Sequence, residues 1–330
     1  MSTNNSMLLI LLMTPLLCTL SNTWITVWVA LELNTLSFCT LMKYKKKEGF
    51  ITMEMSMKYF MIQSISSTVL VFSMVMSKEW GNNKFLWFLG LISIMIKAAA
   101  SPFHQWFINM IKKSKWMDSL ILMTWQKLAP VYLLLYQSKL MIMPFIVLST
   151  ALGSILQMNK TKMTEILALS SVFNLGWMMM GIILSTYLFI LFSMLYWISV
   201  TFVMLMVKKI DEVPKDSMEG ISKKKWINLA IVANLAGIPP LTGFLAKWVI
   251  LKESVGTLLM PVITWVLLLS AINFYVYLRI CTPIFLKSSK MNDNKIKAKK
   301  HIMSMLMFNL TPMVILFSSG AAWKSTILMR

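Results

Sequence analysis

Apolar runs of about 16 to 22 residues recur from one end of this 330-residue chain to the other. A run of that length, coiled as an α-helix, is long enough to cross a hydrocarbon core about 30 Å thick. Because lipid offers no hydrogen-bonding partner to an exposed backbone, each such run has to be helical. Little chain is left between the runs for a soluble domain. The sequence therefore predicts an all-α, polytopic membrane bundle, with one transmembrane domain over residues 1–330.

The apolar runs predict eleven transmembrane helices, two of which are expected to be broken internally. The fourth and the ninth are too long for one straight crossing and contain proline. No small-residue cleavage site follows the first, so we expect it to be a retained helix rather than a secretory signal. The expected spans are 7–21, 24–42, 57–76, 85–111, 119–136, 141–157, 165–184, 186–207, 226–251, 261–281 and 302–321.

The formal net charge of +20 could suggest a nucleic-acid partner, so the positions of the charges have to decide. The loops on the same side of the membrane as the N-terminus hold 22 lysines, and those on the opposite side hold six basic residues. Positive charge concentrates on the side that is not translocated. This sorting accounts for the basic composition without nucleic acid and leaves membrane lipids as a partner. It predicts an N-terminus in the cytoplasm or mitochondrial matrix and, after an odd number of spans, a C-terminus across the membrane.

Beyond the first two residues of each expected span, five charged residues lie inside the spans: Glu32, Lys97, Lys127, Lys247 and Arg279. A lysine at the centre of a membrane helix costs about 2.5 to 3.5 kcal/mol on insertion scales, so such residues usually face a bundle interior and serve transport. The alternative is snorkelling, in which a long side chain reaches the interface from near a helix end. Glu32 and Lys127 lie near the middle of their spans and are predicted to be functional. Arg279 lies close to a span end and is predicted to be an interfacial anchor.

The depth of Lys97 in the membrane depends on whether the fourth span is one straight helix or a broken one. Residues 85–111 would extend about 40 Å as one helix, which is too long for one straight crossing. A break at Pro102 is expected because its ring removes a backbone hydrogen bond and clashes with the preceding turn. Lys97 would then lie near the middle of the membrane, beside freed carbonyl groups. His104 next to the break is interpreted either as a proton carrier or as a polar group satisfied at the break.

The stretch "NLAGIPPLTGFLAKWVI" interrupts the ninth span in the same way. Gly237, Pro239, Pro240 and Gly243 break an otherwise apolar segment. Paired interrupted helices at corresponding positions of two halves indicate a transport site. Lys247 follows this break but lies close to a span end, so snorkelling and a functional role remain open for it.

The two interrupted spans also predict an internal repeat. They are five spans apart, and an odd offset makes them run in opposite directions. A five-helix unit repeated once would therefore be an inverted repeat. We expect the first repeat over about 7–136, the second over about 141–281 and a C-terminal helix over about 302–321.

Four motifs resemble one known family. They are "ELN" at 32–34, "KAAASPFHQW" at 97–106, "TWQKLAP" at 124–130 and "GIPPLTGFLAKW" at 237–248. In this order and on these spans they resemble the mitochondrially encoded members of the antiporter-like subunits of respiratory complex I, NADH:ubiquinone oxidoreductase. The resemblance covers essentially the whole chain, and animal members of that family have eleven helices arranged as inverted five-helix repeats.

The resemblance implies a proton path along the middle of the membrane. Glu32 looks like the acid that modulates Lys97, the switching lysine of the first broken helix, while Lys127 looks like the central relay and Lys247 like the lysine near the exit. Desolvation favours the neutral form of a buried lysine and a nearby carboxylate favours its charged form, so a lysine can be switched, whereas arginine in practice keeps its proton. Asn174 stands where many relatives carry histidine, so a relay role is in doubt there.

The chain is expected to bind no cofactor or metal of its own. Cys18, Cys39 and Cys281 are isolated and lack the spacing that holds an iron–sulfur cluster or zinc. The resemblance implies an enzyme subunit, with NADH, FMN, iron–sulfur clusters and ubiquinone held by partner subunits. It also implies the mitochondrial inner membrane as the location, and neighbouring antiporter-like, small core and accessory subunits of complex I as partners.

Two alternatives use the same helices. A stand-alone cation/proton antiporter would need the same intramembrane lysines but would act without partners. A structural subunit of the membrane arm would conduct nothing and would need only helix packing. The second alternative gives no reason for Glu32, Lys97, Lys127 and Lys247 to match four family positions.

Overall fold

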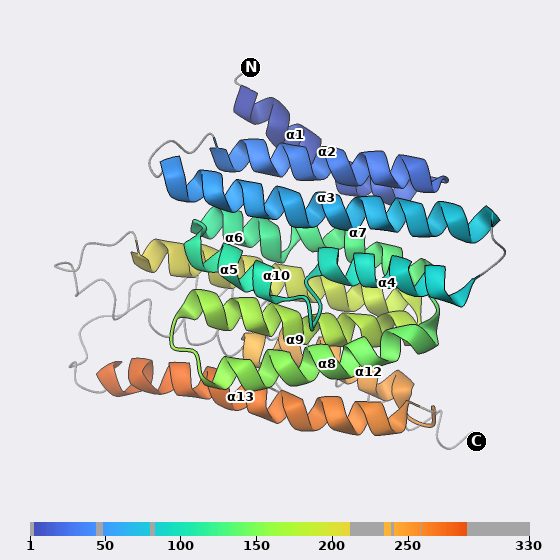
Figure 1. The fold of residues 1–330 in the computed structure, drawn as a ribbon. Coiled ribbons are helices and arrows are strands. Elements are labelled where there is room, and N and C mark those ends of the chain that lie inside the picture. Colours follow the sequence, from blue (N-terminus) through green and yellow to red (C-terminus); the bar gives the residue numbers. More distant parts are fainter. Residues whose placement is uncertain are drawn as a thin grey trace. The chain divides into compact units, whose positions relative to one another are not determined.

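The computed structural model describes residues 3–43, 49–79, 83–211, 234–238, 241–257 and 259–288. Over these residues every regular element is a helix, as expected (Figure 1). The helices are α1 Thr3–Leu20, α2 Trp24–Lys43, α3 Gly49–Glu79, α4 Lys84–Ala98, α5 Gln105–Lys113, α6 Trp116–Met123, α7 Trp125–Leu133, the 3₁₀ helix η2 Leu134–Tyr136, α8 Lys139–Met158, α9 Met163–Leu184, α10 Thr186–Asp211, α12 Thr242–Ser254 and α13 Met260–Ser288.

Most of these helices match the expected membrane spans. Six helices within the described residues are long and apolar enough to cross a membrane, and α1 is a shorter apolar helix. Several run beyond the expected ends, including α3, α10 and α13. A helix satisfies its own backbone, so it can continue past the hydrocarbon core into the interface without loss. The span expected over 302–321 lies outside the described residues.

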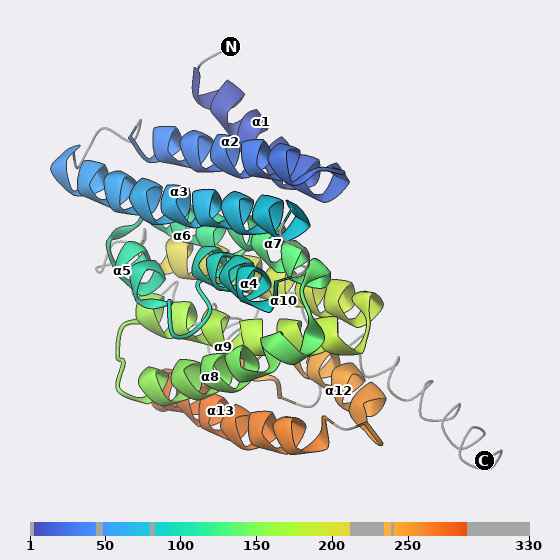
Figure 2. The same ribbon diagram turned by 45° about the vertical axis from the view of Figure 1, so that its right-hand side comes forward.

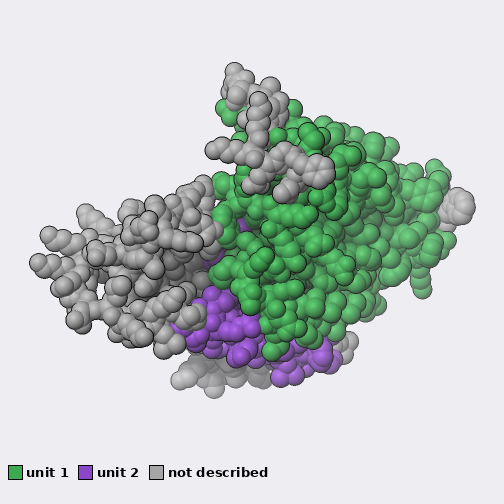
Figure 3. Space-filling model, turned by 60° about the vertical axis from the view of Figure 1, so that its left-hand side comes forward, with its two compact units in different colours: residues 1–189 green, residues 190–330 purple. Residues whose placement is uncertain are grey.

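The chain divides into two compact units, residues 1–189 and residues 190–330, which Figure 3 shows in different colours. The first unit contains α1 to α9, and within it α2 packs beside α3 and α8 beside α9 (Figures 1 and 2). The second unit contains α12, α13 and most of α10. The division into inverted repeats concerns internal symmetry rather than compactness, and it stays a prediction.

Glycine allows α8 and α9 to approach closely. A Cβ atom at Gly153 would lie 2.8 Å from the backbone nitrogen of Phe173, and one at Gly176 would lie 2.3 Å from the Thr150 side chain. Without these Cβ atoms the two backbones come together, which is how membrane helices gain van der Waals packing where lipid gives no hydrophobic driving force. Helices α8 and α9 are therefore closely packed against each other in the first unit.

The break expected in the fourth span is present. Helix α4 ends at Ala98 and α5 begins at Gln105, with Pro102 between them. Ala99 adopts a left-handed conformation (φ 58°), and the amide of Ala100 donates to the carbonyl of Met95 at 3.0 Å. This is a typical helix-terminating hydrogen bond. The helix ends before the proline because a proline disfavours helical geometry in the residue that precedes it.

The span expected over 119–136 is also interrupted, and in this respect the expectation of one continuous helix was wrong. Helices α6 and α7 meet at Thr124, whose hydroxyl donates to the carbonyl of Leu120 at 2.8 Å. Such bonds compete with the backbone ladder and bend helices. Pro130, further along, has no N–H to donate to the carbonyl of Gln126. The sequence shows both residues, but neither one alone predicts where the helix stops.

The break in the ninth span is described in part. Gly237 has a left-handed backbone (φ 81°), and α12 begins at Thr242. The side chain of Asn234 bridges the interruption, because its Oδ1 accepts hydrogen bonds from the Thr242 hydroxyl at 2.8 Å and from the Gly243 amide at 2.7 Å. It thus caps the start of α12 from the preceding helical turn. Pro239, Pro240 and the start of this span at 226–233 lie outside the described residues.

Candidate functional site

Lys97 lies in the last turn of α4, directly before the first break, and only 4% of its surface is exposed. Its ammonium donates to the backbone carbonyl of Gln63 on α3 at 2.9 Å. The neighbouring carbonyl of Ile96 accepts hydrogen bonds from the Ala99 amide at 3.2 Å and from the indole N–H of Trp106 at 3.1 Å. The break therefore leaves Lys97 buried beside backbone oxygens, as expected.

His104 is buried within the break, between α4 and α5. Its Nδ1 lies 3.2 Å from the hydroxyl of Ser101, which is itself fully buried. This contact is what the second interpretation requires, a polar group satisfied at the break. A proton-carrying role for His104 stays a prediction.

Lys127 lies on α7 and is 2% exposed. Its ammonium donates to two atoms of Ser171 on α9, the hydroxyl at 3.1 Å and the carbonyl at 3.2 Å. It also lies over the ring of Phe107, 4.5 Å from the centroid, in cation–π geometry. Within the described residues no carboxylate lies within 4 Å of it. All its partners are uncharged, so no fixed counter-ion holds the proton on this lysine.

Glu32 lies half-buried on α2 and accepts a hydrogen bond from the hydroxyl of Ser67 on α3. It is close enough to Lys97 for their charges to interact. Among the ion pairs of the described residues, however, none joins the two side chains. The structure thus brings the acid into the neighbourhood of the lysine without a direct contact.

Lys97 and Lys127 share a cavity of about 20 Å³ in the first unit. Polar and aromatic side chains from five helices surround it, and neither lysine fills it. The residues lining it are Leu31, Asn34, Thr35, Tyr59, Gln63, Lys97, Ala98, Ala99, Trp106, Phe107, Leu122, Gln126, Lys127 and Pro130. Two of the lysines predicted from their depth in the sequence therefore face one common space.

Asn34, Gln126 and Tyr59 also line this site, although they were not predicted from the sequence. Asn34 follows Glu32 by two residues and Gln126 precedes Lys127 directly, so both lie inside the quoted motifs. All three are buried, and Asn34 and Tyr59 each donate a hydrogen bond to the Gln126 side chain. A buried amide at membrane depth is costly unless it is paired, and this was the available signal.

Lys247 lies on α12 in the second unit and is 8% exposed. A Cβ atom at Gly237 would lie 3.1 Å from its Nζ, so the ammonium packs into the space that this glycine leaves at the break. A snorkelling lysine extends toward the interface instead. The placement therefore favours an interior role over an anchor. Arg279 on α13 is exposed, as an anchor would be.

Asn174 lies on α9, three residues after Ser171, the hydrogen-bonding partner of Lys127. It is 3% exposed and its amide donates to the carbonyl of Ser170 at 2.9 Å. The side chain is thus satisfied within its own helix. An amide cannot take up a proton, and this position supplies a hydrogen bond where a histidine would supply a titrating group.

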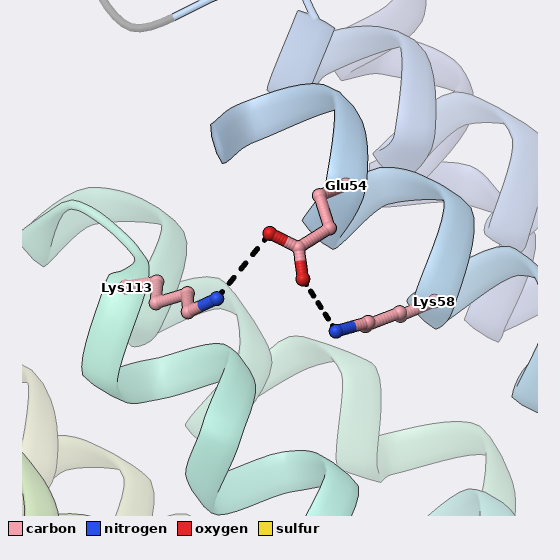
Figure 4. A network of polar contacts seen from close by, with 3 residues as sticks. All are labelled: Glu54, Lys58 and Lys113. Carbon is pink, nitrogen blue, oxygen red and sulfur yellow. Dashed lines mark hydrogen bonds and ion pairs between the residues drawn. The ribbon is translucent and has the colours of Figure 1, made fainter. Parts of the chain in front are cut away.

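Glu54 on α3 gathers lysines from two elements, Lys58 on its own helix and Lys113 at the end of α5, 3.4 Å away (Figure 4). Glu165 on α9 similarly lies 3.5 Å from both Lys112 and Lys160. These four lysines belong to loops that the charge sorting placed on one side of the membrane. The two acids bring them together at the same end of the helices, which supports the assignment of these loops to one face.

Within the described residues, no group of three or more histidine, cysteine, aspartate or glutamate side chains could hold a metal ion. The lysine and amide cluster around the cavity is suited to different chemistry. It offers groups that gain and lose protons, held by neutral partners in the buried interior of the first unit. This arrangement is suited to proton transfer.

Comparison with known proteins places these features in a family. Residues 21–273 match the NADH:quinone oxidoreductase/Mrp antiporter transmembrane family. Over 321 residues the chain is 33% identical to NADH-ubiquinone oxidoreductase chain 2 of Anopheles gambiae, with 93% of this chain and 94% of that protein covered. It is 30% identical to NADH-ubiquinone oxidoreductase chain 2 of Metachirus nudicaudatus, with 94% and 98% covered.

Solved structures share the fold. A chain of respiratory complex I from Thermus thermophilus superimposes with a TM-score of 0.73 at 21% identity, covering 84% of this chain and 69% of that chain. A chain of the Mrp complex from Dietzia sp. superimposes with a TM-score of 0.72 at 16% identity, covering 89% of this chain and 62% of that one. At these identities the likeness extends to the fold alone.

Proposed function

Because this chain belongs to the NADH:quinone oxidoreductase/Mrp antiporter transmembrane family, we propose that it translocates protons as a membrane-arm subunit of a mitochondrial NADH:ubiquinone oxidoreductase. The observation that carries the proposal is the cavity lined by both Lys97 and Lys127. NADH, FMN, iron–sulfur clusters and ubiquinone belong to partner subunits in this scheme. The chain itself supplies a proton path in the inner membrane, and no redox centre.

The relay begins with Glu32 and Lys97. Their charges interact without a direct ion pair, so the stability of the protonated lysine depends on how far the carboxylate lies from it. Desolvation disfavours the charged ammonium. A small movement of Glu32 away from Lys97, driven from a neighbouring subunit, would leave the charge uncompensated and release the proton.

Lys127 is the acceptor across the cavity. Its contacts with Ser171 and Phe107 stabilise the ammonium, yet none of these neutral groups fixes it. The lysine can therefore exist in both states, which a relay requires. An arginine at the same place would hold its proton permanently. We assign Lys247, at the second break, to the exit of the path, as the resemblance implies.

Substitution of Lys127 tests the function. Lys127→Met keeps the length and the apolar stem of the side chain while removing the titrating group, so we expect the complex to assemble. We expect proton translocation coupled to NADH oxidation to fall by at least about tenfold, as for loss of a proton-transferring group. Lys127→Arg should also impair translocation despite keeping the charge. The measurement is protons translocated per NADH oxidised in reconstituted complexes, together with the amount of assembled complex.

Lys139 provides a matched control, because it is an exposed lysine at the start of α8. Lys139→Met removes one charge of the same kind outside the cavity and should leave translocation unchanged. Normal translocation by an assembled Lys127→Met complex would overturn the relay. A purely structural lysine would behave in the opposite way, with loss of assembly in Lys127→Met and near-normal translocation in Lys127→Arg.

A further inference from the structure

Two amide side chains next to the cavity are paired with each other in both directions. The Nδ2 of Asn34 on α2 donates to the Oε1 of Gln126 on α7 at 2.7 Å, and the Nε2 of Gln126 donates back to the Oδ1 of Asn34 at 3.2 Å. Two hydroxyls add to this pair. Thr14 donates to the Asn34 oxygen at 3.2 Å, and Tyr59 donates to the Gln126 oxygen at 3.1 Å. All four side chains are buried.

These hydrogen bonds determine which donors and acceptors of Asn34, Gln126 and Tyr59 are left to bond a molecule in the cavity. A side-chain amide carries two N–H donors and an oxygen with two lone pairs, and a tyrosine hydroxyl both donates and accepts. Each amide oxygen already accepts two hydrogen bonds. One N–H of Asn34 and one N–H of Gln126 remain, together with the lone pairs of the Tyr59 oxygen. Because all three residues line the cavity, it receives donors from the amide pair and an acceptor from the tyrosine.

The cavity volume matches one water molecule. A cavity of about 10 to 15 Å³ holds one water molecule if two to four polar groups contact that water. This cavity measures about 20 Å³. Lys97 and Lys127 complete the set of polar groups. Lys97 uses one of its ammonium protons on the carbonyl of Gln63, and further N–H donors remain.

We propose that Asn34, Gln126 and Tyr59 position a single water molecule that bridges Lys97 and Lys127. The water accepts one hydrogen bond from an amide N–H and one from whichever lysine is charged. It donates one to the neutral lysine and one to the Tyr59 oxygen. All four hydrogen-bonding positions of the water are then used. The proposal rests on the proposed function and identifies residues that act on the lysines through the water, as positioning residues.

Proton transfer through this water is balanced. One N–H bond of the charged Lys97 breaks and an O–H bond forms on the water. The O–H bond directed at the neutral Lys127 breaks, and an N–H bond forms there. Lys97 ends neutral, Lys127 ends charged, and the water is restored with its hydrogens exchanged. No oxidant, reductant or other reactant is required.

The neutrality of the amides explains why these residue types suit the site. A carboxylate in place of Asn34 or Gln126 would attract the ammonium groups and hold the proton on the nearer lysine. A pair of apolar side chains would leave the water without a fixed orientation. Amides orient the water through hydrogen bonds without adding a charge. The hydrogen bonds between the two amides keep their side chains from rotating.

The test compares two buried glutamines, Gln126 on α7 and Gln137 directly after η2. Gln126→Met keeps side-chain length and removes the amide beside the cavity. Gln137→Met makes the same change at a buried glutamine that follows η2 and lies outside the cavity lining. We expect Gln126→Met to slow NADH-coupled proton translocation about tenfold, the size of effect for one lost hydrogen bond. Gln137→Met should leave translocation unchanged. Rates are compared per amount of assembled complex, in H₂O and in D₂O.

Tyr59→Phe removes one oxygen atom and keeps the ring, so it serves where Gln126→Met fails to assemble. We expect it to slow translocation several-fold and to raise the solvent isotope effect, because proton transfer through a misoriented water becomes rate-limiting. A purely structural role would lower the amount of complex and leave the rate per complex and the isotope effect unchanged. That result, in either assembled variant, would overturn the proposal.

Lys127→Met in the same experiment separates this proposal from the proposed function. If Lys127→Met stops translocation while Tyr59→Phe and Gln126→Met translocate normally, the relay holds and the positioned water does not. If Lys127→Met also translocates normally, the relay itself is wrong, and the water proposal falls with it.

Discussion

At the scale of single residues, the charged groups of the candidate site in the first unit are held by neutral partners. Lys97 contacts a backbone carbonyl, Lys127 contacts a serine and an aromatic ring, and Glu32 accepts from a serine hydroxyl. Buried ion pairs are costly to desolvate and hold their protons firmly. Neutral partners satisfy hydrogen bonding and leave the protonation state free to change, which is what proton transfer needs.

Glu32 and Ser67 yield a prediction at this scale. Glu32→Gln keeps the size of the side chain and the hydrogen bond from Ser67, but it removes the negative charge near Lys97. We expect translocation to fall by about tenfold, because the charged form of Lys97 loses its electrostatic partner. Ser67→Ala leaves the carboxylate in place and should have a smaller effect. Equal rates for Glu32→Gln and the unmodified complex, measured by proton uptake in vesicles, would contradict this assignment.

At the scale of helices, helix breaks and glycines determine where the helices position their side chains. The break between α4 and α5 brings Lys97 and Phe107 to the same cavity, and the break at Thr124 precedes Lys127 by three residues. Straight helices would carry these side chains past one another. The contact between Gly153 and Phe173 sets how close α9, and with it Ser171, lies to its neighbours.

Two helical glycines provide a matched test of this packing. A Cβ at Gly153 would lie 2.8 Å from the Phe173 backbone, which cannot yield, whereas a Cβ at Gly90 would lie 2.6 Å from the mobile tip of Met74. We expect Gly153→Ala to destabilise the helix pair by about 1 to 3 kcal/mol through overpacking. Gly90→Ala should change stability by no more than about 1 kcal/mol. The measurement is the temperature at which the detergent-solubilised complex dissociates, and a larger loss for Gly90→Ala would refute the account.

At the scale of the whole molecule, charge sorting predicts the orientation in the membrane. The chain is a multi-pass protein whose relatives are mitochondrial complex I subunits. Glu54 and Glu165 gather lysines from three loops at one end of the helices. The exposed pairs that Glu54 makes with Lys58 and Lys113 contribute little stability each. Their value here is that they mark one face of the first unit as basic.

Orientation gives the prediction at this scale. The basic face should lie in the matrix, so the N-terminus should be there and the C-terminus, after an odd number of spans, in the intermembrane space. A protease added to mitoplasts with an intact inner membrane should cleave an epitope fused after Arg330. An epitope that resists cleavage until the inner membrane is permeabilised would reverse the assignment. An epitope on a partner subunit known to face the matrix serves as the control for membrane integrity.

The sequence by itself determined the class of the protein, most of its spans and the depth of its charged residues. Lipid forces every apolar run of sufficient length to be a helix, so composition and length settle these properties without knowledge of neighbours. The break near Pro102 followed from the same local reasoning, since a proline acts on its own turn of helix. Lys127 was identified from its depth alone, because a central charge is costly wherever its helix packs, and Lys97 was identified from its depth together with the expected break at Pro102.

Only the tertiary structure decided which of these groups meet. The 3.6-residue period gives the face on which a side chain lies, and it does not give the partner across that face. Lys127 contacts Ser171, 44 positions away, and Asn34 pairs with Gln126, 92 positions away. The interruption at Thr124 likewise depends on competition between a hydroxyl and the backbone, which packing settles. The cavity shared by Lys97 and Lys127 exists because several helices close around it, and no single helix carries the information to specify it.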